Sequence, residues 1–221
     1  SPLLANIYLH EVLDTWFAAE VVPRLRAKGF MIRYADDAVI VLASEEDARR
    51  VMEVLGKRFA RYGLTLHPVK TRMVNFRRPG RAEGPPGPPV ESFDMLGFTW
   101  YWGKSRQGKP VVKRKTSSNR FRRALGSIAD WCRQHRHEPV AAQHLDLCRK
   151  LHGHYAYYGI TGNVRALSCF LHEVERAWRY WLNRRSARAK MVWERFQRLL
   201  QRYPLPPMRI VHSIYRSAAK P

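Results

Sequence analysis

The stretch FMIRYADDAVIVLAS, residues 30–44, is the feature that most constrains how this chain can fold. Its β-branched and apolar residues favour strands, yet Asp36 and Asp37 stand side by side at its centre. Two adjacent carboxylates repel each other and resist burial. We therefore predict a hairpin, with strands over residues 30–34 and 39–42 and the ADDA sequence as the turn between them.

Helical patterns flank this hairpin. Residues 1–22 are expected to form a helix, with Ser1 as its cap and Pro2 in its first turn. A broad apolar surface predicts that this helix is well buried, and the residues on that surface are Leu4, Ala5, Ile7, Tyr8, Leu9, Val12 and Trp16. Residues 45–62 also have helical spacing, with Ser44 as the candidate cap.

The rest of the chain alternates between strand-like, loop-like and helical segments. LTLHPVKTRMVNF, residues 64–76, predicts one or two strands broken near Pro68. The proline- and glycine-rich residues 77–91 predict a surface loop or tether, and SFDMLGFTWYW predicts an aromatic strand. The YPLPPMRIVHSIY tail is expected to pack over three helices, which are predicted over residues 117–135, 140–158 and 163–185. The fold class is therefore α+β, with a domain boundary near Gly103.

Positive charge is concentrated in the second half of the chain. Residues 104–221 contain 26 Lys and Arg against 6 Asp and Glu, a net charge of +20, whereas residues 1–103 have a net charge of +2. Nucleic acid is the first candidate partner, because neutralising its phosphates releases counterions. An anionic membrane surface is the second candidate, and a merely soluble basic domain is the remaining alternative.

Cysteine usage and hydropathy bear on the compartment. Cys132, Cys148 and Cys169 are odd in number and widely spaced, which argues against a disulfide framework or a cysteine-rich zinc site. Apolar runs are all shorter than the roughly 18 residues that a membrane span needs, so no span is expected, and nucleic acid rather than a membrane is the expected partner. The cytoplasm is the expected location.

The paired aspartates predict a metal site. Their repulsion at a tight turn must be offset by a cation, and hard oxygen ligands select Mg²⁺ or Mn²⁺. Two such ions about 3.5–4 Å apart can hold the attacking and leaving oxygens of a phosphoryl transfer. With a polyanion-binding second half, this favours nucleotidyl transfer on nucleic acid. The alternative is structural, because aspartate is common in turns without any function.

Several segments resemble one family, in the order in which that family has them. YADD, residues 34–37, is similar to the metal-binding hairpin of reverse transcriptases. SPLLANIYLHEVLD, GLTLHPVKTRMV and FDMLGFTW resemble the palm helix, the next palm motif and the strand that grips the primer end. RKLHGHYAYYGITGN and WRYWLNRR resemble the thumb, or maturase, region of group II intron-encoded proteins. The resemblance implies a partial right-hand polymerase palm over residues 1–103 and an all-helical thumb over residues 104–221.

The resemblance also implies roles for individual palm residues. Asp36 and Asp37 would be two of three palm carboxylates, would bind two Mg²⁺ or Mn²⁺ ions and would be catalytic. Lys70 would lie near the nucleotide phosphates and could protonate the pyrophosphate leaving group, although a solvated lysine is the alternative. The residues near the nucleotide and template would be Ser1, Pro2, Asn6, Tyr34 and Ala35. The residues that position the primer 3′ end would be Leu96, Gly97 and Phe98.

The basic half would bind RNA, since Lys and Arg can neutralise phosphates while bases stack on aromatic rings. The RNA-binding candidates are Lys113, Arg114, Lys115, Arg120, Arg122, Arg123, Arg184 and Arg185. Trp178 and Trp181 recur at helical core spacing, which favours packing. HGHYAYYGITGN is open to either interpretation, because its glycines bring the backbone close to a partner.

The implied function is that of an RNA-directed DNA polymerase with a role in group II intron splicing. Its partners would be an RNA template, intron RNA, a DNA primer and deoxynucleoside triphosphates. Because the sequence begins inside a motif, we expect a fragment that lacks the fingers and the third carboxylate and is inactive alone. The rivals are a non-catalytic RNA-binding splicing factor and a reverse transcriptase of a defence or diversity-generating lineage. The intact YADD argues against the first rival, and the maturase-like thumb against the second.

Overall fold

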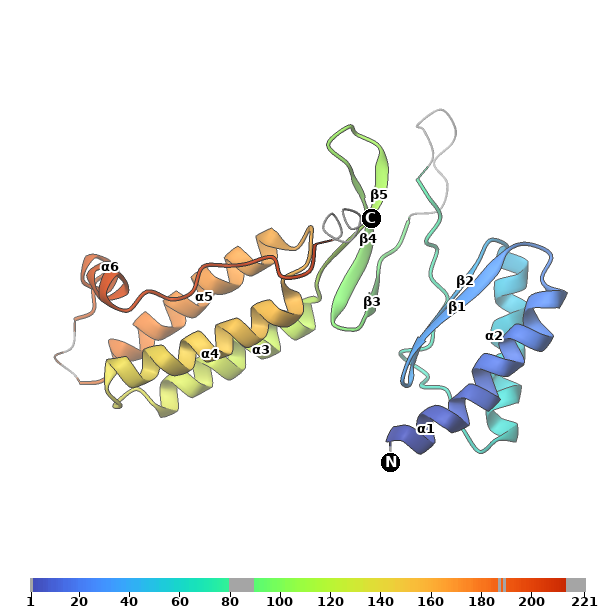
Figure 1. Cartoon of the computed structure of the whole chain (residues 1–221), viewed down its shortest axis with the longest axis horizontal. Helices are drawn as coiled ribbons and strands as arrows, with labels where there is room; N and C mark the ends of the chain where they lie inside the picture. Colours follow the sequence, from blue (N-terminus) through green and yellow to red (C-terminus); the bar gives the residue numbers. More distant parts are fainter. Residues whose placement is uncertain (1, 80–89, 187, 189, 214–221) are drawn as a thin grey trace, which may run out of the picture. The chain divides into compact units, whose positions relative to one another are not determined.

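The computed structural model describes residues 2–79, 90–186, 188 and 190–213. The chain divides into two compact units, residues 1–77 with 84–91 and residues 78–83 with 92–221. The first combines helices with an antiparallel hairpin, and the second combines an antiparallel sheet with helices (Figure 1). The predicted α+β fold class is confirmed. Among the described residues, no helix is long and apolar enough to cross a membrane.

The first unit opens with a continuous helical run. Helix α1 (Pro2–Leu9) leads into η1 (His10–Thr15) and η2 (Phe17–Val21), whose turns are π-helical, and the run ends in η3 (Val22–Arg24). π-Helical turns are rare and often lie at functional sites. The elements that follow are β1 (Gly29–Tyr34), β2 (Asp37–Leu42) and α2 (Glu45–Arg61).

The helices of this unit cover one face of the β1–β2 hairpin (Figure 1). Met31 and Ile40 pair across the hairpin and pack on a core whose buried members are Leu13, Trp16, Phe17, Val21, Val51 and Leu55. Successive strand residues point to opposite faces. Phe30 and Ile32 therefore lie on the other face, where each is 54% exposed.

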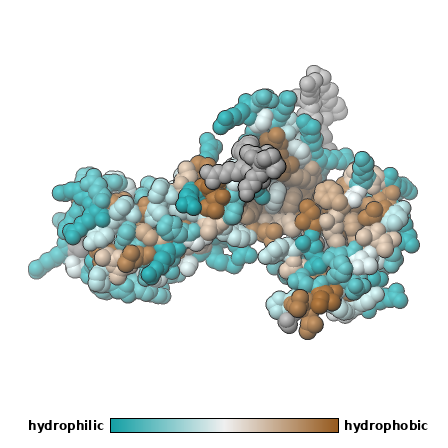
Figure 2. Space-filling model, in the orientation of Figure 1, coloured by the Kyte–Doolittle hydropathy of each residue, from teal (hydrophilic) through white to brown (hydrophobic). Residues whose placement is uncertain are grey.

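The prediction that the first helix is well buried is wrong for its first two turns. Leu3, Leu4 and Ile7 are all more than half exposed, and Figure 2 shows an apolar patch where α1 begins. The Tyr8 hydroxyl donates a 2.7 Å hydrogen bond to the carbonyl of Tyr62, the residue directly after α2. Because α1 begins beyond the end of α2, the residues before Tyr8 have no helix to pack against.

The start of α2 is tied to the chain that enters the hairpin. Ser44 caps the helix, since its side chain accepts a hydrogen bond from the backbone of Asp47, as predicted. The Asp47 carboxylate is buried and accepts hydrogen bonds from the backbone N–H groups of Arg26 (2.9 Å) and Ala27 (3.2 Å). A buried carboxylate needs such donors, so Asp47 fixes where β1 begins.

The segment after α2 contains no strand, which corrects the prediction for residues 64–76. Its β-branched residues favour an extended chain, but a strand also needs a partner ladder, and in the described part of the chain β1 and β2 pair only with each other. Residues 68–70 form a turn instead. Of the predicted loop over residues 77–91, residues 80–89 lie outside the described part.

The second unit begins with a three-stranded antiparallel sheet of β3 (Phe93–Met95), β4 (Phe98–Lys104) and β5 (Pro110–Thr116). The single aromatic strand predicted here is a hairpin instead, because Leu96 and Gly97 form a turn. β5 was not foreseen, since its lysines and arginines obscure the alternation. Gly103, where we predicted a domain boundary, pairs with Val111 inside the sheet, and the two compact units divide before β3.

Three long helices follow the sheet and confirm the predicted periodicity: α3 (Ser118–Gln134), α4 (Val140–Tyr158) and α5 (Val164–Leu182). Trp178 is fully buried and Trp181 packs against the same core, as their spacing predicted. A fourth helix, α6 (Trp193–Arg202), was missed. The tail up to residue 213 runs along the helices, as expected, and Ile160 and His212 form an isolated β-bridge (Figure 1).

Two buried amide side chains join the elements of the second unit. Gln143 accepts from the indole N–H of Trp178 at 2.9 Å and donates to the carbonyl of Glu138 at 2.9 Å. Asn163 accepts from the backbone N–H of Thr116 at 2.9 Å and donates to the Thr116 hydroxyl and the Tyr158 carbonyl. Asn163 thereby ties the end of the sheet to the connection between α4 and α5.

Replacing Asn163→Ala should lower the free energy of unfolding by about 2 kcal/mol, because Thr116 and Tyr158 are left with unsatisfied buried groups. Urea unfolding followed by tryptophan fluorescence reports the second unit, which contains six of the seven tryptophans. The exposed Asn119→Ala is the matched control, with an expected change below about 0.5 kcal/mol. Equal urea midpoints for the two variants would contradict a stabilising role of the Asn163 hydrogen bonds.

Candidate active site

The tip of the β1–β2 hairpin is tighter than the sequence suggested. Tyr34 pairs with Asp37, so the turn consists of Ala35 and Asp36 alone. Ala35 has a φ of +54°, in the left-handed region that non-glycine residues rarely adopt. That conformation costs about 1–2 kcal/mol, so the surrounding structure must stabilise it.

Arg33 supplies this stabilisation from the helix-facing side of the hairpin. Its Nη1 donates to the Ala35 carbonyl at 2.8 Å and to the Asn6 side chain at 2.9 Å. Its Nε and Nη2 donate to the two carboxylate oxygens of Asp14 at 2.8 and 2.6 Å. This contact lowers the pKa of Asp14 below its usual value and raises that of Arg33. Sequence reasoning did not select Arg33 or Asp14, although an arginine at a core-facing strand position implies an acidic partner.

The two carboxylates of the tip are available to a cation. Asp36 and Asp37 are both exposed, and within the described residues neither has an ion-pair partner. Ionised carboxylates only accept, so both present unused oxygens. Mg²⁺ usually takes one or two carboxylates together with substrate phosphates, and this donor set fits that cation. Among the described residues, no three His, Cys, Asp or Glu side chains form a ready-made metal cluster.

The hairpin lies in a region that matches a known protein family. Residues 1–100 match the model of the family described as reverse transcriptase (RNA-dependent DNA polymerase). The chain contains a reverse transcriptase domain. The match spans α1, the hairpin, α2 and the sheet as far as Trp100, and no curated protein matches the chain.

The other predicted nucleotide and template residues of the reverse transcriptase domain lie at two places. Tyr34 flanks the turn and is 67% exposed. Pro2 is exposed at the start of α1, Asn6 is one turn farther along and bonds to Arg33, and Ser1 lies outside the described residues. The Arg33 contact thus links Asn6 directly to the aspartate turn.

Lys70 lies on the surface of the first unit, in the turn over residues 68–70. Its backbone N–H approaches His67 Nδ1 at 3.4 Å, and its side chain is exposed. No hydrogen bond or ion pair among the described residues joins it to Asp36 or Asp37. Its assignment as the general acid therefore stays a prediction.

The predicted primer-grip residues form the β3–β4 turn in the second unit. Leu96 and Gly97 have φ values of +51° and +77°, the combination of a type I′ hairpin turn. The turn is anchored at both residues, because Tyr157 Oη donates to the Leu96 carbonyl and the Ser117 N–H donates to the Gly97 carbonyl, each at 2.9 Å. Phe98 is buried and stacks on Tyr157, with ring centroids 5.8 Å apart.

The HGHYAYYGITGN segment packs on its own chain. Tyr157 and Tyr158 both contact Phe98, and Tyr158 Oη lies 3.0 Å from where a Cβ on Gly97 would stand. A Cβ on Gly159 would approach the carbonyl oxygens of Tyr155 and Arg209 within 2.3 and 2.6 Å. Gly159 is therefore needed for the close approach of the C-terminal tail, and no RNA contact is required to explain it.

Most of the predicted RNA-binding cations gather where β5 passes into α3. Arg114 lies over the ring of Trp100 at 5.5 Å and Lys115 over that of Tyr101 at 5.4 Å, while the side chain of Lys113 covers Gly103. The arginines on the first turns of α3 are exposed, namely Arg120, Arg122 and Arg123. The aromatic contacts orient the strand cations, and the helix cations are exposed to solvent.

The two remaining candidates differ from each other. Arg184 is exposed and lies over the ring of Tyr180 at 3.5 Å. Arg185 instead turns inward and donates to the backbone carbonyls of Arg136 and Glu138 in the connection between α3 and α4. Arg185 thus has a structural contact that its neighbour lacks.

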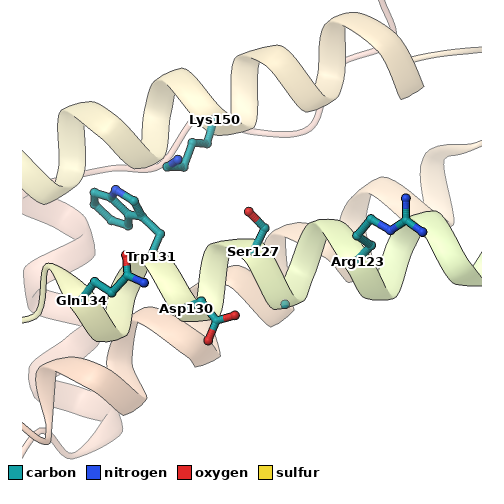
Figure 3. A pocket seen from close by; sticks show the side chains of 7 residues that line it. Arg123, Ser127, Asp130, Trp131, Gln134 and Lys150 are labelled. Carbon is teal, nitrogen blue, oxygen red and sulfur yellow. The ribbon is translucent and has the colours of Figure 1, made fainter.

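A shallow groove of about 550 Å³ runs between α3 and α4 (Figure 3). Arg123 lines one end, and the ammonium of Lys150 lies over the ring of Trp131 at 5.3 Å, as Figure 3 shows. Between them the groove is lined by the small residues Gly126 and Ser127. Asp130 also lines the groove, and His135 stacks on the Trp131 ring with the centroids 4.6 Å apart, so Arg123 and Lys150, rather than the ring, are the groups that can contact a phosphate.

Replacing Gly97→Ala should destabilise the second unit by about 1–2 kcal/mol, because the left-handed turn penalises a Cβ and Tyr158 is already in contact. Gly126→Ala is the matched control, since it lies in helix α3 with open space around it. That substitution should stabilise by about 0.5–1 kcal/mol. Urea midpoints of the two variants should therefore shift in opposite directions, and shifts of the same sign would contradict the turn geometry.

Proposed function

We propose that the chain is the palm and thumb of an RNA-directed DNA polymerase of the group II intron type. Residues 1–103 would form the palm, with β4 paired to β5 across that boundary, and residues 104–221 would form an RNA-binding thumb with a splicing role. The observation that supports the polymerase most strongly is the exposed Asp36–Asp37 pair on a tight turn that an arginine holds from behind. The turn lies within the reverse transcriptase match, which supports a role in nucleotidyl transfer.

The proposed reaction is attack of a primer 3′-hydroxyl on the α-phosphate of a deoxynucleoside triphosphate. Asp36 and Asp37 would hold divalent metal, which when bound would activate the hydroxyl and stabilise charge on the phosphates. Tyr34 and Ala35 would shape the surface beside the nucleotide. Lys70 would give a proton to the leaving pyrophosphate, because a cation near developing negative charge lowers the barrier.

The thumb assignment is supported by charge and by the α3–α4 groove. Residues 104–221 have a net charge of +20, and the exposed arginines of α3 lead into the groove that Arg123 and Lys150 line. A duplex or single strand would lie along this face and would release counterions on binding. The likeness of RKLHGHYAYYGITGN and WRYWLNRR to maturases favours intron RNA as one ligand.

A non-catalytic RNA-binding splicing factor is the second candidate, and the high charge of the thumb favours it equally. The two candidates differ in the hairpin, because an RNA-binding factor has no use for an exposed pair of carboxylates. Negative charge there would only repel RNA.

Asp36→Asn should lower the rate of primer extension at least about 100-fold, because it removes a metal ligand while keeping the shape of the side chain. The assay uses the natural polypeptide that contains residues 1–221, an RNA template, a DNA primer and Mg²⁺. Glu53→Gln, on the exposed face of α2, also removes one negative charge, is the control and should extend at the wild-type rate. Extension by Asp36→Asn at the rate of the control would refute the metal-ligand role.

RNA binding by residues 1–221 should weaken steeply with salt, with a slope of log K against log [salt] of about −3 to −6 if four to eight phosphates are contacted. Arg122→Gln with Arg123→Gln should reduce the slope by about 1–2. Arg49→Gln with Lys57→Gln removes the same charge from the exposed face of α2 and should leave the slope unchanged. Fluorescence anisotropy measures all three, and a flat wild-type slope would contradict the phosphate contacts.

A further inference from the structure

We propose that Arg33 is a positioning residue for the metal-binding turn, and that it transmits the placement of the first helical run to Asp36. This inference rests on the proposed function of the hairpin. Its evidence is separate, because it comes from the four hydrogen bonds of one guanidinium to Asp14, Asn6 and the Ala35 carbonyl.

The contact to the Ala35 carbonyl acts directly on Asp36. That carbonyl belongs to the peptide unit that joins the two residues, and a peptide unit is planar. Fixing its oxygen therefore fixes the direction of the Asp36 N–H and Cα. Because Ala35 has a positive φ, the turn is strained and would relax toward other conformations without this bond.

The other contacts of Arg33 make the anchor rigid. Its side chain is 13% exposed and that of Asp14 is 25% exposed, so the pair is shielded from water much more than the exposed Arg49–Glu45 pair of α2. Two parallel bonds to one carboxylate fix the plane of the guanidinium. Nη1 then donates to both Asn6 and the turn, so one side chain contacts α1 and the hairpin tip.

Lysine cannot replace this geometry. It would keep the positive charge, but its single ammonium cannot span the Asp14 carboxylate and the Ala35 carbonyl in two directions at once. The variant Arg33→Lys therefore separates charge from geometry. Asp14→Asn separates them in the other way, since it keeps the shape of the partner and removes its charge.

The test is steady-state primer extension by the natural polypeptide that contains this chain. Arg33→Lys should lower kcat about 10- to 100-fold, because small misplacements of reacting groups have effects of that size. KM for the primer–template and the urea midpoint of the protein should stay near wild type, which a merely structural role would not produce. Asp14→Asn should have a smaller effect of the same kind, and the double variant should lose little more than Arg33→Lys alone.

Arg49→Lys is the control, because it alters an exposed ion pair on α2 and should leave kcat unchanged. A kcat for Arg33→Lys within about twofold of wild type would overturn the positioning role. If Arg33→Lys does not fold, Asp14→Asn decides, and an unchanged kcat for it has the same meaning. Full activity of Asp36→Asn would instead overturn the proposed function, so the two failures are distinguishable.

Discussion

The contact between Arg33 and Asp14 is the interaction on which the arrangement of the hairpin tip depends. It joins the π-helical part of the first helical run to the hairpin, and the same guanidinium reaches the turn that presents the two aspartates. Because the paired carboxylates are exposed at the tip, they cannot be stabilised by packing of their own. Their arrangement is fixed from the helix-facing side of the hairpin by the Arg33–Asp14 ion pair, which is largely shielded from water.

The second unit is held together differently. Buried amide side chains and close backbone contacts, rather than an ion pair, join its elements. Gln143 and Asn163 each satisfy groups from separate elements, and Gly159 allows the tail to lie against the end of α4. These contacts bring Tyr157 and Tyr158 onto the β3–β4 turn. The turn that resembles a primer grip is thus built into the helical core, while the lysines and arginines around it remain at the surface.

The sequence predicted best where one pattern decides the structure. The hairpin, α2 and the three long helices follow from alternation, caps and 3.6-residue spacing. The sequence predicted burial and strand formation poorly where these depend on a neighbouring element. Periodicity does not show how far a neighbouring helix extends. Leu3, Leu4 and Ile7 are apolar yet exposed for that reason, and residues 64–76 include several β-branched residues yet form no strand. Arg33 was overlooked because its importance arises from Asp14 and Ala35, which only the folded chain brings together.

We propose above all that the hairpin tip holds a divalent metal ion through Asp36 and Asp37. The most direct measurement is paramagnetic broadening by Mn²⁺ in the amide NMR spectrum of the chain. We expect the amide signals of residues 34–38 to broaden first and to recover when Mg²⁺ is added in excess. Broadening that is equally strong in a variant with both aspartates changed to asparagine, or that occurs first elsewhere, would contradict the claim.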